Sequence, residues 1–243
     1  MPREPPVLRR LTTATRWPVG VALTSWNYMW RITPFHRSEA EGDLEHDAPP
    51  ALPDGFDRTE IQGAEEGFGP LFHRTYRTRI RHAEVGPEAL VADVAADLDK
   101  VAPTTFSSFQ KVAGEKGPIR PGEELTVRMA GPWDGPVRVV DVARDHFWLA
   151  TLDGHLEAGQ IIFRARGADD VEHGRLIVFE IESWARSRDR LVNLAYTRLR
   201  MAKEIQLHMW TSFLEGVVKT SGGRMTRGID IETRRVDAVD ALA

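Results

Sequence analysis

Hydrophobic positions in the body of the chain repeat with two different periods, and their order predicts the elements of the fold. Apolar residues alternate with Arg and His over 71–83, which predicts a strand with one wet face. The stretch 86–103 opens with Gly-Pro and then places its apolar residues on one face of a predicted helix. The period of two returns in five stretches divided by Gly, Pro and Asp: 123–131, 135–145, 146–154, 159–169 and 174–187.

The segment 187–223 follows as one long predicted helix, which Gly222 and Gly223 end. Its apolar stripe consists of Ala195, Leu199, Ala202, Met209 and Phe213. Because no helix interrupts the five strands, we expect an antiparallel sheet. This order of elements predicts an α+β, helix-grip fold, in which a curved antiparallel sheet wraps a long C-terminal helix. The shorter stretch 104–114 is interpreted as a helical turn.

The two ends of the chain differ from this body. Residues 1–70 are expected to form an irregular N-terminal extension, with a short amphipathic helix over 19–32 and then an acidic linker rich in Pro and Gly. Residues 71–223 form the predicted helix-grip domain, and residues 224–243 are expected to be a polar, frayed tail. The Trp-rich N-terminal arm either packs on the body or on a partner, or lies on a membrane surface. Its short length favours packing.

Composition and motifs narrow the possible functions. A net charge of −4 and a pI near 6.1 argue against nucleic-acid binding. The chain has no cysteine, which excludes a disulfide framework and a thiolate metal site and is compatible with the cytoplasm, where we expect the protein. No apolar run approaches the roughly 18 residues of a spanning helix. The histidine spacings match no metal motif, and no phosphate-binding glycine loop occurs, so we expect neither a metal nor a cofactor.

The stretch 147–167, together with the following strand and the long helix, resembles the uncharacterised family DUF1990 over roughly 75–223. The residues that match its motif are Thr151, Leu152, Gly154, His155 and Gly159. Asp153 and Leu156 replace prolines of the motif, and Gln160 stands where an acid is usual. The resemblance implies a fold related to the birch-allergen and START-type (SRPBCC) superfamily. The departures favour a retained shape and a hydrogen-bonding imidazole over a retained catalytic acid.

His155 and Glu157 are the candidates for chemistry, because they lie two residues apart beside an Asp-Gly turn. In one interpretation they handle a proton or grip a ligand, since histidine titrates near neutrality and a carboxylate can fix its tautomer. In the other, His155 bonds to the local backbone. The residues alone favour the second interpretation, and the family motif strengthens the first.

Two further polar features lie on predicted elements. Gln206 falls on the apolar stripe of the long helix, where an unsatisfied buried amide would cost about 1–3 kcal/mol. A protein partner is favoured over water or a ligand for this amide. Glu180 and Glu182 share one face of their strand, and a solvated outer face is favoured over an inward polar wall.

Three functions remain open. The first is binding of a small apolar or amphipathic ligand in a cavity between the sheet and the long helix. The expected ligand-binding residues are Phe147, Thr151, His155, Ile162, Phe179, Gln206, Met209 and Phe213. The second is an enzyme of the cyclase, dehydratase or hydrolase type with His155 as general acid/base. The third is an interaction protein that acts through the N-terminal arm.

Overall fold

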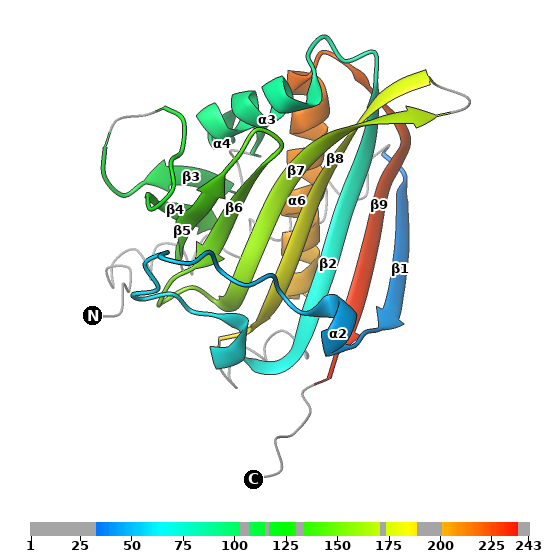
Figure 1. Ribbon diagram of the computed structural model, residues 1–243. Coiled ribbons are helices and arrows are strands. Elements are labelled where there is room, and N and C mark those ends of the chain that lie inside the picture. Colours follow the sequence, from blue (N-terminus) through cyan, green and yellow to red (C-terminus); the bar gives the residue numbers. More distant parts are fainter. Residues whose placement is uncertain are drawn as a thin grey trace.

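One sheet of nine strands forms the frame of the molecule (Figure 1). The computed structural model describes residues 33–102, 107–114, 117–129, 134–170, 174–188 and 201–237. The strands are β1 (Phe35–Glu41), β2 (Phe68–Arg81), β3 (Ser107–Lys111), β4 (Glu124–Met129), β5 (Asp134–Val142), β6 (His146–Thr151), β7 (Glu157–Asp170), β8 (Gly174–Ser187) and β9 (Arg224–Val236). Their order across the sheet is β1-β9-β2-β8-β7-β6-β5-β4-β3.

The helices lie on one face of this curved sheet, which we call the inner face (Figure 1). They are α3 (Pro87–Ala96), α4 (Leu98–Val101) and α6 (Met201–Thr220), whereas the short α2 (Leu44–Asp47) and the 3-10 turn η1 (Ala64–Glu66) belong to the N-terminal part. The five strands predicted between 123 and 187 are β4 to β8, and each pairs antiparallel with the next. The α+β, helix-grip fold predicted from the sequence is therefore confirmed.

Three local predictions were wrong. Residues 224–236 are not a frayed tail but strand β9, which lies between β1 and β2 and buries Ile229 and Ile231. Within the expected irregular extension, residues 35–41 form β1, which runs parallel to β9. Residues 107–111 form the edge strand β3 rather than a helical turn. In each case cross-strand pairing decides the structure, and it overrides a sequence that is rich in polar residues.

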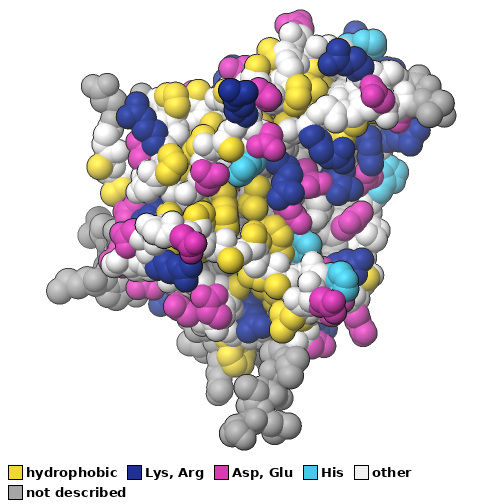
Figure 2. Space-filling model, in the orientation of Figure 1, with side chains coloured by type: hydrophobic (Ala, Val, Ile, Leu, Met, Phe, Trp, Pro, Cys, Tyr) yellow, Lys and Arg dark blue, Asp and Glu magenta, His cyan; other side chains and the backbone are white. Residues whose placement is uncertain are grey.

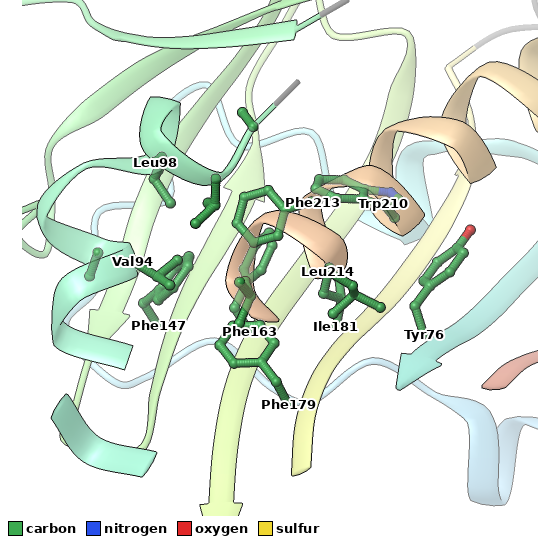
Figure 3. Close-up of a cluster of buried hydrophobic side chains, with 14 of the residues drawn as sticks. Tyr76, Val94, Leu98, Phe147, Phe163, Phe179, Ile181, Trp210, Phe213 and Leu214 are labelled. Atoms are coloured by element: carbon green, nitrogen blue, oxygen red, sulfur yellow. The ribbon is translucent and has the colours of Figure 1, made fainter. Parts of the chain in front are cut away.

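The inner face carries a packed core between the sheet and the three helices (Figure 3). The rings of Phe147 and Phe163 stack with their centroids 4.5 Å apart, and Phe213 of α6 lies 5.3 Å from Phe163. Phe179 and Leu214 are fully buried beside them. Aromatic side chains from β6, β7 and β8 thus meet the C-terminal half of α6 and hold it against the sheet.

The opposite, outer face is crossed by residues 42–66, which we call the outer strap (Figure 1). The strap covers a second hydrophobic cluster that includes Trp148, Ile162 and Trp184, and Figure 2 shows hydrophobic side chains near the middle of this face with charged ones around them. Arg138 donates hydrogen bonds to the carbonyl oxygens of Asp57 (3.0 Å) and Thr59 (2.8 Å). These bonds fix the strap to β5.

His73 on β2 holds the beginning of the strap. Its Nδ1 lies 2.8 Å from an Asp47 oxygen and its Nε2 lies 2.9 Å from a Glu182 oxygen, while its ring stacks on Trp184 at 4.9 Å. Arg234 faces Asp47 at 3.7 Å and Arg164 faces Glu182 at 2.9 Å. Burial opposes protonation of the imidazole, but the hydrogen bonds to the two carboxylates prevail and raise the pKa of His73.

The raised pKa predicts a stability that depends on pH. Protonated His73 stabilises the fold below the unfolded-state pKa of about 6.5, and this contribution is lost as the pH rises through the higher folded-state pKa. We therefore expect His73→Gln to lower the free energy of unfolding by about 1–3 kcal/mol at pH 6 and by less at pH 8.5. Urea unfolding of both proteins at the two pH values measures this difference. His46→Gln, at an exposed position of α2, is the control, and a wild-type-minus-variant difference independent of pH would contradict the prediction.

The backbones of β7 and β8 approach each other closely at Gly159. A Cβ at this position would collide with the Trp184 carbonyl oxygen, whereas a Cβ at Gly167 of the same strand would meet no atom within 4 Å. We expect Gly159→Ala to lower the free energy of unfolding by about 2–4 kcal/mol, because the strands must separate, and Gly167→Ala to change it by about 0.5 kcal/mol or less. Equal effects in a urea titration would show that the close approach does not limit stability.

Candidate functional site

Residues 151–159, which we call the motif loop, connect β6 to β7 and are closed by hydrogen bonds to Thr151. The Thr151 hydroxyl accepts a hydrogen bond from the Gly159 amide at 2.8 Å. It can donate to the carbonyl oxygen of Gln62, which lies 2.8 Å away, or to that of Gly159, which lies 3.0 Å away. The side chain is buried, so these bonds form away from water. Two motif residues therefore have a structural explanation, since Thr151 and Gly159 close the loop. Inside it, the backbone amide of His155 bonds to the Leu152 carbonyl at 3.0 Å.

His155 is directed at the backbone of the same loop. Its Nδ1 lies 2.9 Å from both the amide nitrogen and the carbonyl oxygen of Glu157. Its Nε2 is held against Gly135, where a Cβ would come within 2.8 Å. Burial lowers the pKa of His155, and the Glu157 charge and carbonyl oppose this only in part, so the ring is neutral at neutral pH. The geometry corresponds to the interpretation in which the imidazole bonds to the local backbone.

Gln62 of the outer strap completes the motif loop, although no pattern in the sequence points to it. Its side-chain amide donates to the carbonyl oxygens of His155 (3.1 Å) and Glu157 (2.8 Å). Its own carbonyl accepts from the Gly159 amide at 2.9 Å, and its amide donates to the Thr151 carbonyl at 2.8 Å. A segment interpreted as a linker thus supplies a side chain that bonds to two carbonyl groups of the loop.

The Glu157 side chain leaves the motif loop and reaches the inner face. Its Oε2 accepts a hydrogen bond from Gln206 Nε2 of α6 at 3.1 Å, and Gln206 Oε1 accepts from Arg74 Nη1 of β2 at 3.0 Å. The two charges therefore lie at opposite ends of one amide. Gln206 points at the sheet as the sequence predicted, and protein groups satisfy it at both ends.

Arg74 is the functional candidate that the sequence interpretation missed. Its side chain is only 5% exposed and lies over the Phe72 ring, 4.6 Å from the centroid. Among the residues that the structure describes, no carboxylate comes within ion-pair distance of it, and its Nη2 has no hydrogen-bond partner. The alternation of β2 was the available signal, because Arg74 has the same parity as Phe72 and Tyr76 on the apolar face.

Two successive rows across β2, β8 and β7 lie beneath successive turns of α6. Tyr76, Ile181 and Phe163 form the first row, over which Trp210 packs with its ring 5.6 Å from Phe163 (Figure 3). Burial raises the pKa of Tyr76 to about 12, so this phenol keeps its proton.

Arg74, Ser183 and Ile161 form the second row, which we call the Arg74 row. Arg74 and Ser183 are directly opposed on antiparallel strands, where Cβ atoms lie about 4.5–5.5 Å apart. Ser183 is 4% exposed, and its Oγ has no hydrogen-bond partner among the described residues. On this face of β8, the large Phe179 and Ile181 are thus followed by the small Ser183 and Ala185.

The other predicted ligand-binding residues lie elsewhere. Phe147, Phe179, Met209 and Phe213 are buried in the core of the inner face, where they pack with other side chains of the sheet and helices. The expectation for Ile162 is wrong, because it lies in the outer cluster with Trp148 and Trp184. Its neighbour Ile161 is the residue that faces inward, since the side chains of a strand alternate between the two faces.

Glu180 and Glu182 lie on the outer face, as the favoured interpretation expected. Both are paired rather than freely solvated, and their side chains are 13% and 17% exposed. Glu180 accepts from Arg77 at 2.6 Å, and Glu182 bonds to His73 and Arg164. The expected N-terminal helix over 19–32 and the N-terminal part of the long helix lie outside the described residues. Within the part that is described, no helix is both long and apolar enough to cross a membrane.

Comparisons with solved structures give low similarity. A hypothetical protein, jhp0584 from Helicobacter pylori, aligns with 8% identity over 60% of this chain and 86% of its own, with a TM-score of 0.39. The major latex-like protein 151 of Panax ginseng aligns with 14% identity over 56% and 97%, with a TM-score of 0.33. The protein Ara h 8.0201 aligns with 11% identity over 61% and 97%, with a TM-score of 0.33.

No curated protein matches the chain. A family model does match, over residues 59–214, and its description is a domain of unknown function, DUF1990. The matched range begins beside Gln62 in the outer strap, runs through the motif loop and ends in α6. It covers well over half of the chain, and the chain therefore belongs to the DUF1990 family.

Proposed function

We propose that this protein binds a small amphipathic molecule between the sheet and the N-terminal half of α6, at the Arg74 row. The observation that carries the proposal is a set of buried polar atoms without hydrogen-bond partners among the described residues: Arg74 Nη2, Ser183 Oγ and Trp210 Nε1. Arg74 and Ser183 are cross-strand neighbours, and Trp210 lies on the turn of α6 after Gln206.

The free-energy cost of leaving these polar atoms without hydrogen bonds favours the binding of a ligand. Leaving a buried donor unsatisfied costs about 1–3 kcal/mol, and most buried polar groups in proteins therefore have a partner. Arg74 and Ser183 are cross-strand neighbours and Trp210 lies one helical turn from Gln206, so these atoms can serve as donors for the polar end of a bound molecule. Ile161 of the same row, with Phe72 and Ala185 of the neighbouring one, supplies apolar contacts for the hydrocarbon part of the ligand.

The proposal assigns no reaction to the protein. The acid/base role considered for His155 finds no support in the geometry, since Nδ1 bonds to the backbone of Glu157 and Nε2 faces Gly135. The imidazole contributes instead by shaping the loop from which the Glu157 side chain reaches Gln206. We place the binding function in the cytoplasm, in keeping with a chain that has no cysteine.

Filling the proposed position should weaken binding without unfolding the protein. We expect Ala185→Leu to reduce the affinity for ten-carbon amphiphiles, decanoate and 1-decanol, by at least about tenfold, because its added methyl groups take the ligand's place next to Ser183. Isothermal titration calorimetry measures the affinity, and the unfolding midpoint should change by only a few degrees.

Ala168→Leu, at a half-buried position near the far end of β7, is the matched control and should leave binding intact. A marked loss of stability in Ala185→Leu would mean that side chains already fill the position, and the proposal would fail. Binding by the wild type that Ala185→Leu does not affect would place the ligand elsewhere and would also contradict it.

A further inference from the structure

We propose that Arg74 selects ligands that carry a single negative charge, so that the natural ligand is an amphipathic carboxylate. This inference rests on the proposed binding function and adds the chemical class of the ligand. The guanidinium of Arg74 always carries its charge. A buried cation is destabilising unless an anion or several hydrogen bonds compensate it.

Few groups within the described part of the chain compensate the positive charge of Arg74. Its two contacts are to neutral groups, namely the Gln206 amide oxygen at 3.0 Å and the face of the Phe72 ring at 4.6 Å. The Glu157 carboxylate is connected to Arg74 only indirectly, through the side-chain amide of Gln206. One hydrogen bond and one ring leave Nη2 free to bind a further acceptor.

The donors around this position select for an acceptor. Arg74 Nη2 and Trp210 Nε1 can only donate, and the Ser183 hydroxyl can donate as well. A carboxylate has two oxygens with about four acceptor positions, and it forms short, strong bonds to a guanidinium. A neutral hydroxyl would satisfy fewer of these donors and would leave the charge of Arg74 uncompensated.

Glu157 limits the ligand to one negative charge. Arg74 and Glu157 bond to the two ends of the same Gln206 amide, so both charges lie near the same position. A monoanion neutralises Arg74, whereas a dianion would also be repelled by Glu157. A cationic ligand would have to displace the amide of Gln206 from Glu157.

A series of ligands that share one hydrocarbon chain tests this inference. Decanoate, 1-decanol and decylamine differ only in their head group, and near neutral pH the first is an anion and the last a cation. We expect wild-type protein to bind decanoate at least about tenfold more tightly than 1-decanol in calorimetric titrations, and to bind decylamine most weakly. Arg74→Met should bring decanoate and 1-decanol to within about threefold of each other, mainly by weakening decanoate.

Arg77→Met is the matched control, because Arg77 lies on the same strand but on the outer face, where it pairs with Glu180. This variant should keep the preference for decanoate. Should Arg74→Met not fold, Ser183→Ala carries the test, with an expected loss of about threefold or more for decanoate alone.

The possible failures are distinct. Equal binding of decanoate and 1-decanol by the wild type would overturn the role of Arg74 and leave the binding function standing. A preference for decylamine would assign recognition to Glu157 and would also overturn the inference. If none of the three compounds binds, the proposed function itself fails and this inference fails with it.

Discussion

The hydrogen bonds among Thr151, Gly159 and Gln62 are the constraint on which the rest of the structure depends. They close the motif loop, start β7 against β8 at a position where only glycine fits, and fasten the outer strap to the end of β6. They also set the backbone of Glu157, whose carboxylate then meets Gln206 on the other face of the sheet. One buried network of this kind therefore connects the outer face to the candidate site.

The inner face has two parts with different physical roles. Around the C-terminal half of α6, packed aromatic rings such as Phe147, Phe163 and Phe213 fill the space and hold the domain together. Towards the motif loop, the rows instead carry Arg74 and Ser183, with donors that the described residues leave unsatisfied. A rigid apolar core next to a polar, incompletely paired end is the arrangement expected of a site that positions an amphipathic molecule.

The period of the hydrophobic residues was sufficient to predict the five antiparallel strands, the long helix and the helix-grip class. Each of these segments buries one face, and its apolar residues repeat accordingly. The period failed for β9, where charged residues such as Asp230 pair with Arg79 on the outer face and the inward Ile229 and Ile231 were too few to stand out. The motif led to His155 and Glu157, and Glu157 does reach Gln206 on α6. Arg74, which bonds to the other end of this amide about eighty residues away along the chain, was missed. Neither Gln62 nor the pairing of Arg74 with Ser183 could be predicted, since both depend on which strands become neighbours.

The central claim is that the buried Arg74, whose Nη2 has no partner among the described residues, binds the head group of a ligand. A crystal structure of the protein with decanoate bound tests this most directly. We expect the carboxylate within about 3 Å of Arg74 Nη2 and Ser183 Oγ, the hydrocarbon chain against Ile161 and Ala185, and the bonds from Gln206 to Arg74 and Glu157 preserved. Decanoate bound away from the Arg74 row, with Nη2 engaged by a protein carbonyl or carboxylate instead, would contradict the account.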